Sequence, residues 1–512
     1  MKTLHLSGFL SILLLIPGCL FGQQAGDLDT TFGAGGMLSS AFGNDGIKAV
    51  FHLQDGKILA TGSSDQQEFI LARYEEDGAL DNAYGMDGYI AVPNTGMLTA
   101  AALQPGENPY IVLSGYNASG TVVVKYHLDG TADSSFGWNG MVQTDICGQG
   151  FSDYAQAVAV QPDHKIVVAG YCRDDTFTVE TRLNVIRYLP DGNVDSSFGT
   201  DGIISAANFP ALGAEVYALQ LQNDQKILVS GYNGGSFICI RFNTDGTTDS
   251  TFGANGVFSV AIGYIQFGSG GAFCTSSLLQ PDGKILLAGW ASSSMPAAMA
   301  AALIRLNPDG TADPDFGDEG ISVYEYPGNK YTRAYSLALQ EDGKIVTAGI
   351  LQHTYTNYHE NFYLLRFLDN GAVDTAFGDM GTVVTAVSDS SMIYSVTVQN
   401  DGKILAGGYG NNGFSMARYH ASSTTDTATA VDDMPLLPHA VSLFPNPAQN
   451  KIQLTFAAGI YPQDITITDM YGRNMRFDFS KNAIDISAFG AGVYFVRIIT
   501  NKGVVLKRFI KD

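Results

Sequence analysis

The chain has 512 residues, 59 of them glycine, and 45% of the residues are hydrophobic. Glycine at this frequency separates many short elements, which is typical of an all-β protein and argues against a helical one. With 50 acidic against 28 basic side chains, the formal net charge of −22 repels phosphate backbones and argues against nucleic acid as a partner.

The N-terminus predicts a signal peptide over residues 1–22. Lys2 precedes an apolar run at residues 9–16, and small residues follow near Gly22. The run is too short to span a bilayer. Ile16-Pro17-Gly18-Cys19 also resembles a lipoprotein box, so lipid attachment at Cys19 is an alternative to cleavage near Gly22. No later segment is long and apolar enough to span a bilayer, so we expect no transmembrane segment in the mature chain.

Two phrases recur in a fixed order along residues 27–420. The first is glutamine, an acidic turn, Lys-Ile and a glycine five residues after the lysine, as in Gln280-Pro281-Asp282-Gly283-Lys284 to Gly289. The second is an apolar run ending in a cation, then Asp-Gly, Asp, Phe-Gly and Gly, as from Arg187 to Gly202. The period of about 53 to 61 residues is right for a four-stranded propeller blade.

The pattern predicts a seven-bladed β-propeller that is closed by its own N-terminus. The first phrase occurs in seven copies, and each period divides into four apolar runs that suit strands buried on both faces. Asp29 and Phe32-Gly33 begin the array with a fourth strand that lacks its first three, whereas residues 393–420 supply three strands without a fourth. We therefore expect the two ends to complete one blade.

The two phrases resemble the delta-60 repeat family, whose pattern is similar to NHL-type propellers. The resemblance covers residues 27–420 and implies a propeller without implying a ligand or a reaction. The recurring cation, such as Arg187, and the recurring aspartate, such as Asp195, read first as buried pairs of the scaffold. A ring of ligand-binding charges is the alternative.

Variable loops on one face of the propeller are the expected binding region, because function usually sits on variable loops of a rigid scaffold. Aromatic side chains in or beside them could stack on sugars, contact a protein partner or only pack. No catalytic residue, cofactor or metal site is identified, since His353, His359 and Glu360 lack metal-ligand spacing and a third ligand. The candidate ligand-binding residues are Tyr264, Phe267, Trp290, Tyr331, Tyr355 and Tyr358.

Four cysteines follow the signal peptide. Cys147 and Cys172 are both expected to project toward the variable loops and could form a disulfide in an oxidising compartment, whereas Cys239 reads as core.

Residues 421–438 have the composition of a linker, and residues 439–512 read as a small β-sandwich. This tail resembles the type A C-terminal sorting domain of the type IX secretion system of Bacteroidetes. The resemblance implies the type IX secretion machinery as a partner, and removal of the tail with release or attachment to surface lipopolysaccharide. The motif residues that carry the resemblance include Pro445, Asn446, Pro447, Asp469, Gly472, Arg473, Gly492, Tyr494 and Lys507.

Taken together, these patterns predict a secreted or cell-surface propeller that binds a glycan or protein ligand, for example in adhesion, without catalysing a reaction. The alternative is a polysaccharide-active hydrolase or lyase whose acidic residues come from different blades, which no sequence motif can locate.

Overall fold

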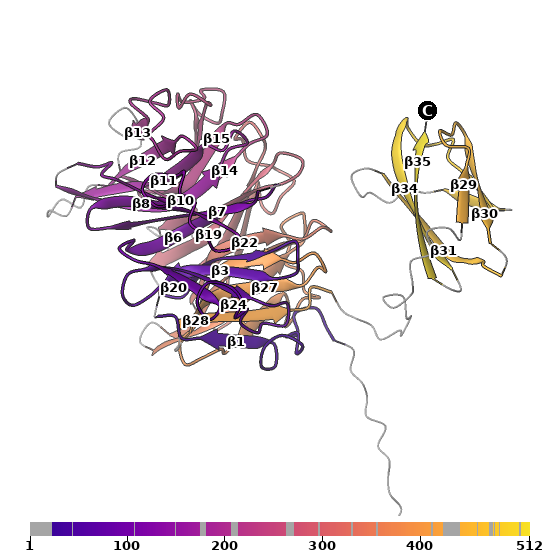
Figure 1. Ribbon diagram of the computed structural model, residues 1–512, viewed down its shortest axis with the longest axis horizontal. Helices are drawn as coiled ribbons and strands as arrows, with labels where there is room; N and C mark the ends of the chain where they lie inside the picture. Colours follow the sequence, from indigo (N-terminus) through magenta and orange to yellow (C-terminus); the bar gives the residue numbers. More distant parts are fainter. Residues whose placement is uncertain are drawn as a thin grey trace, which may run out of the picture. The chain divides into compact units, whose positions relative to one another are not determined.

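The computed structural model consists of two compact units, residues 1–424 and 425–512, and each is described by itself (Figure 1). The predicted signal peptide and nearly all of the predicted linker lie outside the described residues. All regular structure in the described residues is β, and no helix among them could cross a membrane. The described residues are 23–43, 45–106, 108–148, 150–174, 181–205, 213–262, 271–294, 297–328, 331–354, 357–410, 413–422, 441–457, 459–469, 475, 477–480, 482–500 and 503–511.

The first unit is built from antiparallel four-stranded sheets whose strands follow chain order. The first sheet comprises β2 (Ile47–His52), β3 (Ile58–Ser63), β4 (Phe69–Tyr74) and β5 (Tyr89–Val92). The second comprises β6 (Met97–Gln104), β7 (Tyr110–Asn117), β8 (Gly120–His127) and β9 (Met141–Thr144). The third comprises β10 (Phe151–Val160), β11 (Ile166–Asp174), β12 (Thr181–Tyr188) and β13 (Ile203–Ser205), and the fourth comprises β14 (Ala214–Leu221), β15 (Ile227–Asn233), β16 (Ser236–Phe242) and β17 (Val257–Val260).

The next eight strands form one sheet, although it divides into two sets of four. A single parallel residue pair, Met299 with Tyr331, joins the sets. One set comprises β18 (Ala272–Leu279), β19 (Ile285–Ser294), β20 (Ala297–Leu306) and β21 (Ile321–Tyr324). The other comprises β22 (Tyr331–Leu339), β23 (Ile345–Thr354), β24 (Asn357–Phe367) and β25 (Thr382–Thr385).

The last sheet of this unit joins the two ends of the repeat region. It consists of β26 (Met392–Val398), β27 (Ile404–Gly410), β28 (Gly413–Tyr419) and the N-terminal β1 (Met37–Ser40). β1 lies antiparallel beside β28, with Met37 opposite Ala417, and Figure 1 shows the indigo β1 next to the orange β28. The Asp29 carboxylate accepts a hydrogen bond from Arg418 Nε at 2.7 Å. The N-terminal segment therefore supplies the outer strand of the last sheet, as the split repeat predicts.

Hydrophobic packing between consecutive sheets forms the core of this unit. A representative cluster combines Val167 and Leu183 of the third sheet with Val216 and Ile238 of the fourth, all buried. The last sheet packs on the first in the same way, because Phe414 of β28 shares a buried cluster with residues of β2, β3 and β4. Each sheet alone would expose both apolar faces, so the neighbouring sheets complete the burial of its core.

The recurring cations pair with aspartates, and the arginines among them also connect their sheets to the next one. Arg187 Nε donates to the buried Asp195 carboxylate at 2.8 Å, and the guanidinium lies 4.4 Å from the Phe198 ring centroid. Arg187 Nη1 also donates to the Thr244 carbonyl of the next sheet. These contacts make the pair part of the scaffold. The same pairing recurs at Arg73–Asp81, Lys125–Asp133, Arg241–Asp249, Arg305–Asp313, Arg366–Asp374 and Arg418–Asp29.

Asp195, one of these aspartates, makes the stability of the protein depend on pH. Burial alone would raise the pKa of Asp195, but hydrogen bonds from Ser197 and Lys165 and the charge of Arg187 outweigh it and lower the pKa to about 2. Because the folded-state pKa lies below the unfolded value near ~3.9, the stabilisation is present above that value and lost as pH falls through the folded pKa.

We therefore expect the contribution of Asp195 to the free energy of unfolding, at most about 2 kcal/mol, to be lost between about pH 4 and pH 2. Urea unfolding at several pH values measures it. Asp195→Asn should reduce the change in the free energy of unfolding with pH by this contribution. A free energy of unfolding that does not change with pH in the unaltered chain would contradict the prediction.

The second unit contains two sheets that share one hydrophobic core. The first sheet comprises β29 (Val441–Phe444), β30 (Lys451–Phe456), β33 (Ala483–Asp485) and β32 (Asp478–Ser480). The second comprises β31 (Pro462–Asp469), β34 (Gly492–Thr500) and β35 (Gly503–Lys511). Ile452 and Ile484 of the first sheet are buried in one cluster with Ile467, Val496 and Phe509 of the second.

Several residues of the predicted sorting motifs hold this unit together. Asn446 accepts a hydrogen bond from Ile510 N at 2.9 Å and donates one to the Arg508 carbonyl, which fixes the Pro-Asn-Pro segment to the last strand. The buried Tyr494 donates its hydroxyl to the Gly490 carbonyl and stacks on Phe509. Asp469 pairs with Tyr494 in the strand register, Gly492 begins β34 and Lys507 lies half-buried on β35. Gly472 and Arg473 lie outside the described residues.

Candidate functional site

The first strand of every four-stranded set in the repeat region carries a β-bulge near its start. In β18, for example, Cys274 pairs with Gly289 and Ser276 with Ala288, which leaves Thr275 as the extra residue. An extra residue kinks the strand and re-aims its side chain. The bulge residues are Lys48, Thr99, Gln156, Tyr217, Thr275, Tyr335 and Tyr394.

A glycine of the second strand explains why the bulge recurs. A Cβ atom built on Gly289 would lie 1.8 Å from the Phe273 carbonyl oxygen, and one on Gly231 would lie 1.9 Å from the Glu215 carbonyl oxygen. Only a residue without a side chain permits this approach of the two backbones. This is the glycine five residues after the repeat lysine. The equivalent clash occurs at Gly62, Gly115, Gly170, Gly349 and Gly408.

All seven bulge residues, one from the first strand of each four-stranded set, line one cavity of about 450 Å³. Because the bulges lie near the starts of these strands, the cavity lies toward the connections that lead from one sheet to the next. Aromatic residues that directly follow the strand glycine, such as Tyr232 and Trp290, complete its wall together with Phe273. We call this cavity the channel mouth. Its remaining described lining residues are Met97, Leu98 and Tyr116.

An unbroken series of aromatic contacts follows the channel mouth. Trp290 is stacked on Phe273 at 5.1 Å between centroids and meets Tyr335 edge-on at 5.7 Å. Tyr335 in turn lies 5.9 Å from Tyr394. These side chains are half-buried, so each keeps part of its ring exposed. In the other direction from Phe273, the series continues through Tyr232, Tyr217, Tyr171 and Tyr154 to Tyr116.

One carboxylate is bound to a tyrosine of this series. The Tyr217 hydroxyl donates to Glu215 Oε2 at 2.9 Å. Burial, with added repulsion from Glu215, raises the pKa of Tyr217 well above its ordinary value and that of Tyr171 to about 12. Both hydroxyls therefore stay protonated near neutral pH and act as hydrogen-bonding groups.

Two cations lie against the aromatic rings of the channel mouth. Lys48 Nζ is 3.9 Å from the Tyr394 ring centroid, and the Arg333 guanidinium is 5.7 Å from that of Trp290. Burial lowers the pKa of Lys48, while the charge of Asp45 opposes that change. Cations over aromatic faces gain electrostatic attraction from the ring.

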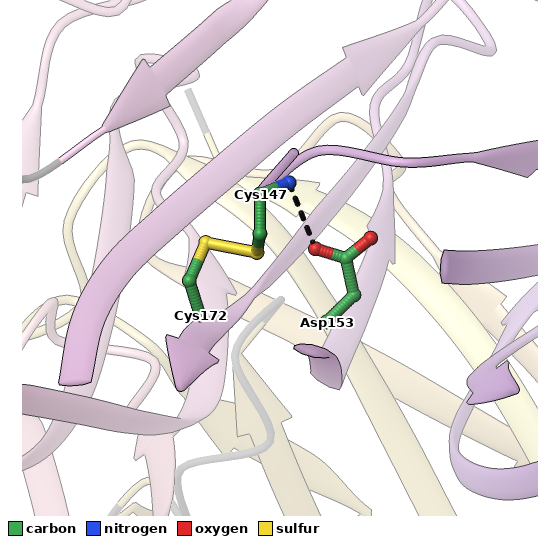
Figure 2. Close-up of side chains that lie close together, drawn as sticks. All are labelled: Cys147, Asp153 and Cys172. Atoms are coloured by element: carbon green, nitrogen blue, oxygen red, sulfur yellow. Dashed lines mark hydrogen bonds between the residues drawn. A yellow bond between two sulfur atoms is a disulfide. The ribbon is translucent and has the colours of Figure 1, made fainter. Parts of the chain in front are cut away.

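A disulfide fixes one side of this region. Cys147 and Cys172 are joined with 2.08 Å between their sulfur atoms, and Figure 2 shows the Asp153 carboxylate beside the bond. Asp153 is buried and accepts backbone N–H groups of Cys147, Ile146 and Thr121. Burial raises the pKa of Asp153. Tyr171 directly precedes Cys172 and Tyr154 directly follows Asp153, so two residues of the aromatic series are chain neighbours of this cluster.

The candidate ligand-binding residues predicted from the sequence do not all lie at the channel mouth. Trp290 lines the channel mouth, whereas Tyr331 is only 7% exposed and lies outside the described lining, which leaves it little ring surface for stacking on a ligand. Tyr264, Phe267 and Tyr355 lie outside the described residues, as does the side chain of Tyr358 in β24. Cys239 is buried and carries a free thiol.

The histidine pair offers no assembled metal site among the described side chains. His359 is exposed, and its Nδ1 lies 3.1 Å from the Asp389 carbonyl oxygen, while the His353 side chain is outside the described part. Glu360 lies within hydrogen-bonding distance of Ser390.

Sequence reasoning missed the bulge residues, because a bulge depends on strand pairing and not on composition. One feature of the sequence could have pointed to the wall of the channel mouth. An aromatic residue directly follows the repeat glycine at Tyr116, Tyr171, Tyr232, Trp290 and Tyr409.

The comparison with family models agrees with this architecture. Residues 53–84, 161–198, 222–252, 280–316, 340–377 and 399–428 match the domain of unknown function (DUF5122) beta-propeller. Residues 442–512 match the secretion system C-terminal sorting domain. The repeats therefore match a DUF5122 β-propeller model, and the tail matches a sorting domain. The tail indicates export of this propeller protein by type IX secretion, to the cell surface or beyond.

Solved structures similar to this chain are distant. A protein from Lactobacillus plantarum is 12% identical, with 66% of this chain and 88% of that chain covered and a TM-score of 0.41. Sqt1 of Chaetomium thermophilum is 12% identical, with coverages of 74% and 84% and a TM-score of 0.44. The Pan2 WD40 domain of Neurospora crassa is 11% identical, with coverages of 74% and 89% and a TM-score of 0.41. No curated protein matches the chain.

Proposed function

We propose that this protein is an exported, closed propeller of seven blades that binds a glycan at the channel mouth without catalysing a reaction. A signal peptide at residues 1–22 and a β-sandwich sorting tail at residues 439–512 deliver the propeller of residues 27–420, with residues 421–438 as the linker. After export, the tail is removed, with release of the propeller or its attachment to surface lipopolysaccharide.

The half-exposed aromatic wall of the channel mouth carries the proposal. Trp290, Tyr335 and Tyr394 present ring surface around a cavity of about 450 Å³, a volume within the usual range of ligand sites. Gln156 and Thr275, from the bulges of the same ring, add hydrogen-bonding groups. Aromatic faces with a few placed polar groups match the alternating apolar and hydroxyl surfaces of a sugar ring.

The lining favours binding over hydrolysis. Glycoside hydrolysis ordinarily requires two carboxyl groups flanking the scissile bond. The described residues that line the channel mouth include no carboxylate, and the nearby Glu215 is bound to Tyr217. The raised pKa of Tyr217 also disfavours a phenolate base of the kind a lyase would need.

The two tryptophans of the chain allow a matched test of the site. After a glycan array identifies a ligand, we expect Trp290→Ala to weaken its binding about tenfold or more in calorimetry, because a central aromatic anchor would be lost. Trp138→Ala should leave the affinity unchanged, since Trp138 is 79% exposed and lies outside the lining. Equal affinities of Trp290→Ala and the unaltered chain would remove the channel mouth as the site.

A further inference from the structure

The two cations at the channel mouth bear on which glycan would bind there. The ring series Trp290, Tyr335 and Tyr394 has Arg333 against one end and Lys48 against the other. Lys48 is itself a bulge residue and a lining residue of the cavity, so its position is set by the same backbone feature as the aromatic wall.

Neither cation forms a described ion pair with the protein. Most cations of the propeller lie within 4.0 Å of a carboxylate, as Arg187 does with Asp195. In the part of the chain that the structure describes, no carboxylate oxygen lies that close to Lys48 or Arg333. The nearest contacts are the Tyr394 ring for Lys48, and for Arg333 the Trp290 ring and the Met299 sulfur, which accepts from Nε.

The described acidic groups near the channel mouth do not neutralise the charges of Lys48 and Arg333 through ion pairs. Asp45 acts on Lys48 through its charge without an ion pair, and Glu215 is hydrogen-bonded to Tyr217 on a different part of the ring. A half-buried ammonium group without a carboxylate partner gains most from an anion that enters the cavity. The formal net charge of −22 disfavours the approach of anions to the molecule as a whole, so an anionic ligand would need a direct contact such as the one with Lys48.

We propose that the ligand is an anionic saccharide, which stacks a sugar ring on the Trp290–Tyr335–Tyr394 wall and places its acidic group at Lys48. This inference rests on the proposed glycan-binding function and deepens it. A carboxylate of a uronic acid and a sulfate ester share the chemistry that Lys48 would recognise, because each offers anionic oxygens to the ammonium group.

The test measures affinity of the full chain, by calorimetry, for three probes: an oligogalacturonate, a sulfated galactan oligosaccharide and the neutral galactan oligosaccharide. We expect at least one anionic probe to bind about tenfold or more tightly than the neutral one. Lys48→Met should abolish that preference, because it weakens binding of the anionic probe about tenfold more than binding of the neutral probe, and Lys48→Arg should retain it. Lys451→Met makes the same charge change in the second unit, at an exposed side chain, and should have no effect.

The two possible failures are distinguishable. Equal binding of anionic and neutral probes, or a preference that survives Lys48→Met, would overturn the anionic assignment, while sensitivity to Trp290→Ala would keep glycan binding in place. If an array of neutral and anionic glycans gives no ligand at all, the glycan-binding function fails and this inference fails with it. Thermal unfolding of each variant confirms that the propeller persists.

Discussion

Deletion of residues 27–42 is expected to destabilise the whole propeller rather than fray one edge. The segment supplies β1 to the last sheet, the buried Phe32 and the carboxylate of Asp29. Removing one partner of a buried ion pair costs about 3–5 kcal/mol, and losing a buried phenylalanine costs a similar amount. Together these losses approach the ~5–15 kcal/mol that stabilises a typical domain.

Denaturant unfolding and light scattering measure this loss. We expect the deleted chain to unfold at much lower denaturant concentration or to aggregate, because β28 would become an exposed edge. Asp29→Ala should reproduce part of the loss, whereas Asp129→Ala, at an exposed turn, should cost less than about 1 kcal/mol. A monomeric deletion variant with unchanged stability would contradict closure of the ring by the N-terminus.

Deletion of residues 438–512 is expected to abolish export while the propeller still folds. The sorting domain matches residues 442–512, and its core is built from its own two sheets. The first unit has separate hydrophobic clusters, so its stability does not depend on the tail core. We expect surface and medium levels to fall at least about tenfold, with folded propeller retained in the periplasm.

Cell fractionation with a protease-resistance assay tests this prediction, with the full-length chain expressed in the same host as the control. Undiminished surface or medium levels of the truncated chain would show that the tail is dispensable for export.

The scaffold could be predicted from local patterns in the sequence. The repeat phrases predicted the strands, the Arg187–Asp195 type of pair and the completion of the last sheet by the N-terminal strand, because each depends on residues at fixed spacings. The matched family models confirm the predicted β-propeller and the predicted sorting domain. The seven-blade count, the delta-60 name, the signal peptide and the bacterial group stay predictions.

The channel mouth was less accessible to sequence reasoning. Its wall comes from residues such as Lys48, Tyr217 and Tyr394, which lie far apart in the chain and converge only when the sheets form a ring. Their inward direction also requires a bulge opposite a glycine, such as Gly408 opposite the Met392 carbonyl. The residues predicted from the sequence were aromatic residues in or beside the loops, whereas the residues of the aromatic wall lie on the strands.

A structure of the propeller with a bound oligosaccharide would show whether the channel mouth binds a glycan without cleaving it. We expect an uncleaved saccharide in the channel mouth, with a sugar ring stacked on Trp290 or its neighbour Tyr335 and in reach of Gln156 or Thr275. A saccharide bound elsewhere on the propeller, or one found cleaved with new reducing ends in solution, would contradict it.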